Sequence, residues 1–161
     1  MPKSTRTWVV VADGAVAQLF VPNTKATALV CTSLPRLASA ATHRHARDLK
    51  SDRPGRSFSS AGGGTRHAIE PRHDHHKMEK HNFTAAVAKA LDLACAAGAF
   101  DQLVLVAPRR SVGELRTLLS KRVQARIGKV IAKDMTKASA AELWPHVAQI
   151  VRYPTLAQTD R

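Results

Sequence analysis

The sequence predicts a single α/β domain, with a mixed sheet of about five strands and three main helices in the order β-β-β-long loop-α-β-α-β-α. Three observations support this class. The chain has 161 residues, enough for one domain with its own core. Short apolar, β-branched runs occur near the start and again past residue 100. Later stretches repeat apolar residues at helical spacing.

Three strands are expected at the beginning of the chain. Trp8 to Ala12 and Ala15 to Val21 are apolar runs, and Asp13-Gly14 between them is the signal of a two-residue type I′ hairpin turn. Ala28 to Leu34 is a third run that a proline stops. Together these runs predict a three-stranded meander.

The helices and remaining strands follow the long loop. Phe83, Val87, Leu91 and Ala94 share one face of a helix, for which we expect Asp74 as the N-cap and Gly98 as the C′ residue just beyond its end. Gln102 to Ala107 reads as a strand that is buried on both faces.

The last third of the chain predicts two more helices around one strand. Ser111 is expected to cap the second helix, and Lys129 to Ala132 to form the final strand. Ser139 and Glu142 form a capping box for the last helix, which Pro145 should kink or shorten. Residues 153–161 are polar and are expected to fray.

Residues 36–76 are predicted to form a long basic loop, because no apolar period of 2 or 3.6 runs through most of them. Formal net charge is +13, and two stretches, Arg36 to His81 and Arg109 to Lys137, carry twelve of these charges. Such uneven charge favours a polyanionic partner, either RNA or an anionic membrane. The alternative is a solvated basic surface.

The chain is expected to be a cytoplasmic protein without a membrane span. No apolar window approaches the roughly 18 residues that a span needs, and the run from Trp8 to Ala12 is too short for a signal peptide. Cys31 and Cys95 belong to no CxxC pair and sit in apolar segments, which predicts two reduced core thiols, although a disulfide stays open. The oligomeric state is not predicted.

The long loop carries the candidate binding residues. Its arginines can make bidentate phosphate contacts, and three consecutive glycines would let the loop tip approach a partner closely. The alternatives are a plain linker and arginines paired with the chain's own carboxylates. The residues concerned are Arg53, Arg56, Arg66, Arg72, Gly62, Gly63 and Gly64.

Two groups of residues could hold a metal ion, but another role is favoured for each. His73, His75 and His76 could bind a transition metal, but neighbouring loop residues rarely converge on one ion, so an RNA-facing cluster is preferred. Asp13 and Asp134 each follow a strand and could hold Mg²⁺ in a nuclease, but a turn and a cap are the preferred roles. No cofactor is predicted.

Several motifs resemble the bacterial host attachment protein family. They are the Trp-aliphatic-Ala-Asp-Gly start at residues 8–14, the Leu-x-Ser-Asp-Arg-Pro-Gly-Arg-Ser-Phe motif at 49–58, Gly-x-x-Arg-His-Ala at 63–68 and Lys-Asp-aliphatic-Thr at 133–136. The Gly-Gly-Thr segment and the later Met-Glu-Lys-His-Asn-Phe segment also resemble the middle domain of archaeal and eukaryotic class-one release factors and pelota, where the loop reads Gly-Gly-Gln.

The resemblance implies a ribonuclease-H-like fold and a ribosome- or RNA-binding protein that inserts its glycine-rich loop, in ribosome rescue or silencing. It adds Thr65, His67, Lys80 and His81 to the candidate binding residues. Thr65 stands where the release factors have glutamine, which puts peptidyl-tRNA hydrolysis in doubt. The alternatives are a surface attachment factor, as the family name implies, and a hydrolase, either a peptidyl-tRNA hydrolase or a metal-dependent nuclease.

Overall fold

The chain forms one α/β domain built on a mixed sheet. The computed structural model describes residues 5–32, 37–38 and 70–153, with the side chains of 37–38 and 70–73 left undescribed. The strands lie in the order β3-β2-β1-β5-β6, with β4 also paired to β2, and are β1 (Thr7–Ala12), β2 (Val16–Pro22), β3 (Leu29–Cys31), β4 (Leu37–Ala38), β5 (Gln102–Val106) and β6 (Ile127–Ile131). β2 is antiparallel to β1 and β3, whereas β5 is parallel to β1 and β6. The predicted class and the early meander are confirmed.

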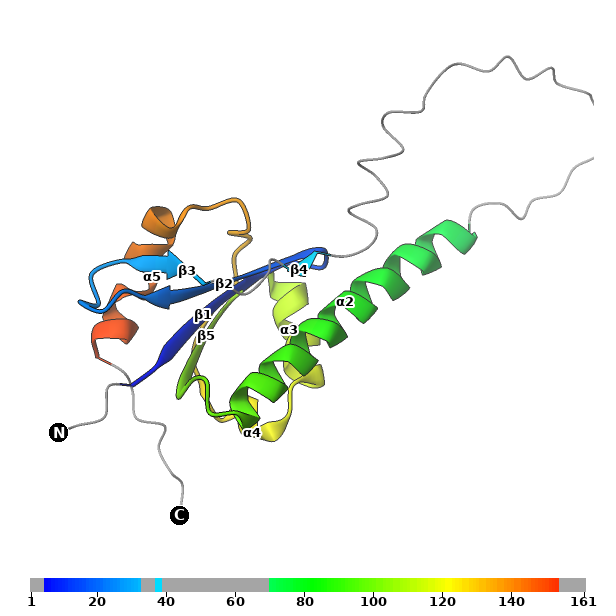
Figure 1. The fold of residues 1–161 in the computed structure, drawn as a ribbon. Helices are drawn as coiled ribbons and strands as arrows, with labels where there is room; N and C mark the ends of the chain where they lie inside the picture. Colours follow the sequence, from blue (N-terminus) through cyan, green and yellow to red (C-terminus); the bar gives the residue numbers. More distant parts are fainter. Residues whose placement is uncertain (1–4, 33–36, 39–69, 154–161) are drawn as a thin grey trace, which may run out of the picture.

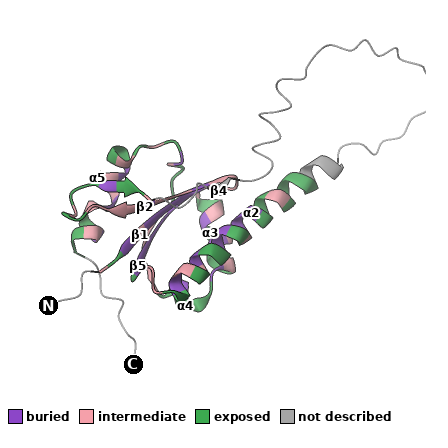
Figure 2. Cartoon of the chain, in the orientation of Figure 1, coloured by how far each residue is buried: buried purple, intermediate pink, exposed green. Residues whose placement is uncertain are grey.

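Helices cover both faces of this sheet (Figure 1). α2 (Glu70–Ala96), α3 (Arg109–Leu118) and α4 (Lys121–Gln124) lie on one face, and α5 (Ala140–Arg152) on the other. Neighbouring strand residues point to opposite faces, so Leu103 and Leu105 pack toward α2 and α3 while Val104 and Val106 pack toward α5. Every residue of β5 is buried, as predicted (Figure 2). In the described ranges, no helix combines the length and the apolar character needed to cross a bilayer.

The β1–β2 hairpin is confirmed, but the predicted type I′ turn is wrong. Neither Asp13 nor Gly14 has a positive φ angle, which that turn requires at both central positions. Instead, Asp13 Oδ1 accepts hydrogen bonds from the backbone N–H groups of Ala15 at 2.6 Å and Val16 at 2.7 Å. The carboxylate therefore closes the turn, in the way aspartate side chains commonly do.

Helix α2 begins earlier than the sequence indicated. It starts at Glu70, so Asp74 lies inside the helix and the prediction of a loop as far as residue 76 is wrong. β4 also falls within the predicted loop. The expected apolar face is confirmed, because Phe83, Val87 and Leu91 are buried. The helix ends at Ala96, and Gly98 follows it with a φ of 68°, the left-handed conformation expected of the predicted C′ residue.

The later elements agree with the sequence except at their ends. Pro108, and not Ser111, occupies the N-cap of α3, because the helix begins at Arg109. The capping box of Ser139 and Glu142 is present, and α5 continues through Pro145 to Arg152, so the predicted shortening is wrong. The expected tail begins at Tyr153, which is the C-cap of α5, and residues 154–161 lie outside the described part of the chain.

The two cysteines have different surroundings, and both are free thiols. Cys95 on α2 is buried, as expected of a core residue. Cys31 is exposed on β3, so its prediction as a core thiol is wrong. β3 lies at one edge of the sheet and has a neighbouring strand on one side only. Side chains of such a strand are covered less completely than those of a central strand, so an apolar run there can leave a cysteine exposed.

Candidate functional site

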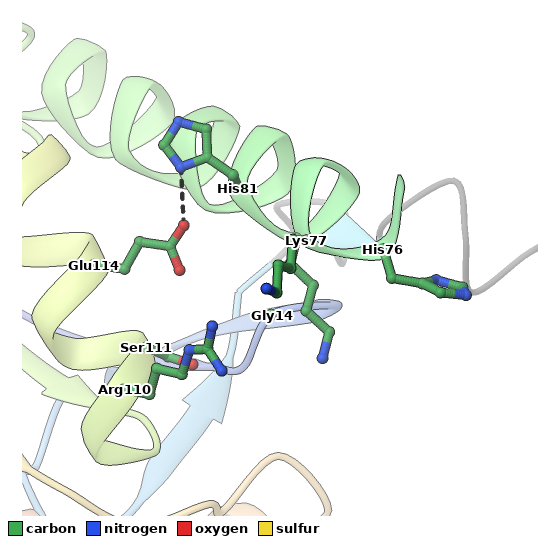
Figure 3. Close-up of a pocket in the computed structure, with 8 residues that line it drawn as sticks. Gly14, His76, Lys77, His81, Arg110, Ser111 and Glu114 are labelled. Carbon is green, nitrogen blue, oxygen red and sulfur yellow. Dashed lines mark hydrogen bonds and ion pairs between the residues drawn. The ribbon is translucent and has the colours of Figure 1, made fainter. Parts of the chain in front are cut away.

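A basic pocket lies where α2, α3 and the β1–β2 turn meet (Figure 3). Its volume is about 640 Å³. We call it the basic pocket, and its described lining residues are Gly14 from the turn, His76, Lys77, Lys80 and His81 from α2, and Arg110, Ser111 and Glu114 from α3. Packing on the sheet thus holds the polar faces of α2 and α3 side by side, next to the β1–β2 turn.

Helical spacing brings the α2 residues onto one side of that helix. Lys77 and Lys80 are three residues apart, and Lys77 and His81 are four apart, so each pair lies one above the other. Like charges at this spacing destabilise an isolated helix by roughly 0.2–0.5 kcal/mol per pair. α2 tolerates this repulsion because its C-terminal half is held by the core through Val87 and Leu91.

The first turn of α3 adds positive potential to the same pocket. Its first described intrahelical bond runs from Val112 N–H to Pro108 C=O, so the backbone N–H groups of Arg109, Arg110 and Ser111 lie ahead of the hydrogen-bonded helix. No side chain caps this end, and no acidic residue lies in the first turn. A helix N-terminus carries partial positive charge, which reinforces the guanidinium of Arg110.

Glycine at position 14 shapes the floor of the pocket. A Cβ atom there would lie 3.1 Å from both Cγ and Cδ of Lys80. The aliphatic stem of Lys80 therefore crosses the β1–β2 turn closely, as long cationic side chains often pack their stems on neighbouring surface. Lys80 is also linked to the helix interior, because its carbonyl accepts a 2.8 Å hydrogen bond from Thr84 Oγ1.

One carboxylate faces these cations. Glu114 Oε1 on α3 lies 3.0 Å from His81 Nδ1 on α2, and this contact joins the two helices across the pocket (Figure 3). The side chain of Glu114 is 31% exposed. Two lysines and an arginine outweigh this acid, so the pocket as a whole favours an anion.

The structure brings together two of the predicted binding residues. Lys80 and His81 both line the basic pocket. Arg72 lies within α2, but its side chain is not described. The other predicted residues lie outside the described part of the chain: Arg53, Arg56, Gly62, Gly63, Gly64, Thr65, Arg66 and His67. Their roles stay predictions, as does any hydrolytic activity that depends on Thr65.

The histidines and the strand-end aspartates show no metal centre in the described ranges, where no group of three or more potential ligands is arranged around one point. His75 and His76 lie on α2, and His76 lines the basic pocket; the side chain of His73 is not described. Asp134 accepts hydrogen bonds from the backbone N–H and the hydroxyl of Thr136, which lower the pKa of its carboxyl. Asp13 thus has the turn role that the sequence favoured. The predicted cap role of Asp134 is wrong, because its carboxylate bonds Thr136 in a turn and Ser139 is the N-cap of the helix that follows.

The sequence reasoning missed part of the site. Ser111 was predicted as a helix cap and Gly14 as a turn residue, and neither Arg110 nor Glu114 was among the predicted binding residues. The Arg109 to Lys137 charge excess did signal a second basic region. What the sequence could not supply was the packing of α3 beside α2, which merges two charged stretches into one pocket.

Comparison with known proteins identifies the family. A family model described as "Protein required for attachment to host cells" matches residues 8–147. No curated protein matches the chain. The matched residues span every described strand and helix except the last residues of α5 and the first residue of β1. This chain therefore belongs to the family of proteins required for attachment to host cells.

Proposed function

We propose that the protein binds an anionic polymer in the basic pocket, and that this binding serves the attachment to host cells for which its family is described. One observation carries the proposal: Lys77, Lys80 and Arg110, from two different helices, line a single pocket of about 640 Å³. Cations that line one pocket repel one another, and a bound anion offsets that repulsion.

RNA is the first candidate polymer. A single nucleic-acid strand carries one negative charge per nucleotide, so several phosphates could lie near the pocket at once. The chain's net charge of +13 suits so dense a polyanion. Residues 39–69, which contain Arg53, Arg56 and Arg66, precede α2 directly in the sequence and would supply further phosphate contacts.

An acidic polysaccharide on the host surface is the second candidate. The family description favours it, because a protein that attaches cells could act by holding such a polymer directly. Its carboxylate or sulfate groups would meet the same lysines and arginine. Many of these polymers carry fewer charges per unit length than RNA, so their binding should depend less steeply on salt.

The experiment measures binding of a labelled single-stranded RNA by fluorescence anisotropy over a series of salt concentrations. For Lys80→Ala we expect weaker binding and a log–log salt slope reduced by about 0.7–1, the effect of losing one phosphate contact. Lys89→Ala is the matched control, because Lys89 lies on the same helix, is exposed and does not line the pocket. The proposal would be contradicted if all three variants, Lys77→Ala, Lys80→Ala and Arg110→Ala, bound RNA with the same affinity and the same salt slope as wild type.

Two further measurements separate the candidate polymers. An acidic polysaccharide that displaces RNA at equal charge concentration, and binds more tightly, would favour the second candidate. The attachment role is tested in cells that carry wild-type or Lys80→Ala protein at the same expression level. We expect attachment to host cells to fall in the variant, while the Lys89→Ala strain attaches as the wild type does.

A further inference from the structure

Glu114 is an unusual residue for an anion-binding pocket. It is the one carboxylate among the described residues that line the basic pocket. A negative charge beside Lys77, Lys80 and Arg110 lowers the local potential and weakens binding of any simple anion. Its presence therefore needs a structural or a binding explanation.

The structural explanation accounts for only one of the two carboxylate oxygens of Glu114. Glu114 Oε1 lies 3.0 Å from His81 Nδ1 and ties α3 to α2. Within the part of the chain that the structure describes, no donor bonds to the other oxygen, although Glu114 lines the pocket. An ionised carboxylate accepts hydrogen bonds at both oxygens, so an acceptor remains beside the cations.

We propose that this acceptor receives a sugar hydroxyl, so that the basic pocket takes a sugar unit with a phosphate and a neighbouring free hydroxyl, as in the ribose of RNA. The proposal rests on the binding function proposed above. The phosphate lies against Lys77, Lys80 and Arg110, and the hydroxyl donates to Glu114. Because the 2′-hydroxyl is what distinguishes RNA from DNA at a given contact, Glu114 makes the pocket selective for RNA.

Other anions lack one half of this arrangement. Single-stranded DNA presents phosphates but has no 2′-hydroxyl beside them, so for DNA Glu114 is a source of repulsion. A hydrogen bond from a hydroxyl to a charged group is stronger than one between neutral groups. Glu114 therefore weakens the binding of DNA and strengthens the binding of RNA. An experiment can detect both effects by comparing the two affinities.

The test compares RNA and DNA single strands of the same sequence, bound to wild type, Glu114→Ala and His81→Ala. Both variants remove the contact between α2 and α3, but only Glu114→Ala removes the acceptor. We expect wild type to prefer RNA by on the order of tenfold. His81→Ala removes a pocket residue and should bind both strands more weakly, but with the same preference for RNA. In Glu114→Ala the ratio of RNA to DNA affinity should fall toward one, while affinity for DNA stays equal or rises.

The outcomes distinguish this inference from the proposed function. Equal affinity of wild type for RNA and DNA, or an RNA preference that survives in Glu114→Ala, overturns the inference while leaving polymer binding in place. Loss of the preference in both variants also overturns it, since the helix contact would then be the cause. Tighter binding of an acidic polysaccharide than of RNA overturns the assignment to ribose. RNA binding that is unaffected by Lys80→Ala removes the proposed function itself, and the inference with it.

Discussion

The stem of Lys80 on α2 packs across Gly14 in the β1–β2 turn, where a Cβ atom would lie 3.1 Å from the lysine Cγ and Cδ atoms. Two segments that are far apart in the sequence are thereby coupled at the basic pocket. The turn needs no positive φ angle at Gly14, so the glycine is not required for backbone conformation. Its lack of a side chain instead leaves room for the lysine.

Gly14→Ala should therefore weaken ligand binding while leaving the fold intact. The added methyl group displaces the flexible Lys80 stem by a few tenths of an ångström, which costs little stability but shifts the ammonium group. We expect RNA affinity to fall by about two- to fivefold, corresponding to roughly 0.4–1 kcal/mol. Anisotropy titration measures the affinity and thermal unfolding the stability; unchanged affinity would show that the position of Lys80 is not set by the turn.

Gly113→Ala is the control for that experiment and a prediction in itself. Gly113 is an exposed interior residue of α3, and a Cβ atom there meets no other atom within 4 Å. Alanine forms helices better than glycine by about 0.8–1 kcal/mol, so the variant should be more stable by roughly that amount. The midpoint of thermal unfolding should rise by about 2–4 °C, with RNA affinity close to that of wild type. A lower midpoint would mean that α3 tolerates no added side chain at this position.

Acid should weaken a link between the residues that immediately precede β1 and β5. Arg6 donates to Asp101 through its side chain, at 3.1 Å to each carboxylate oxygen, and through its backbone N–H at 3.0 Å. These bonds lower the pKa of Asp101 below its ordinary value of 3.8. A lowered folded-state pKa means that the stabilisation is present above pH 3.8 and is lost as the pH falls through the lower folded value.

The corresponding measurement compares the free energy of unfolding of wild type and Asp101→Asn between pH 7 and pH 2. Asparagine cannot ionise, so the variant lacks this pH-dependent contribution. We expect wild type to be the more stable protein at neutral pH, with the difference shrinking below about pH 4. Both side chains are substantially exposed, so the difference should also decrease with added salt. A difference that stays constant down to pH 2 would contradict the role of the ion pair.

Most of the fold was predictable because its signals are local. Apolar runs located β1, β2 and β5, and the 3.6-residue period located the buried face of α2 through Phe83, Val87 and Leu91. The start of α2 was misplaced because residues 70–76 are polar or charged apart from Pro71, so no apolar period marks them as helix. The turn type was also misjudged, because the carboxylate of Asp13 binds the backbone in place of the conformation that Asp-Gly usually indicates.

The site was less predictable because it depends on contacts between distant segments. Lys80 and His81 were expected from the resemblance, but their partners on α3 were not. Glu114 is 33 residues from His81 in the sequence, and the spacing contains no signal for that contact. Local patterns report the face of a helix, whereas only packing on the sheet decides which two polar faces meet.

Gly128→Ala should destabilise the protein through a buried side chain. A Cβ atom at Gly128 on β6 would overlap the amide nitrogen of Gln102 on β5, with further contacts at 3.0 Å to Cδ and 3.1 Å to Cγ. Gln102 is only 3% exposed and its Oε1 is held by Thr7 Oγ1 at 3.2 Å, so it has little freedom to move. Overpacking of this kind costs roughly 1–3 kcal/mol, which denaturant unfolding would measure.

A double-mutant cycle isolates the cause of that loss. In a Gln102→Ala background the overlapping atoms are absent, so Gly128→Ala should cost much less than in wild type, with a coupling of about 1 kcal/mol or more. Gln102→Ala alone removes the bond to Thr7 and a buried amide whose nitrogen has no described partner, two effects that partly offset each other. If the effects of the two substitutions on stability were strictly additive, the cost of Gly128→Ala would lie in the β6 backbone instead. Glycine and alanine differ in the backbone conformations they favour in a strand, even where the side chain contacts nothing.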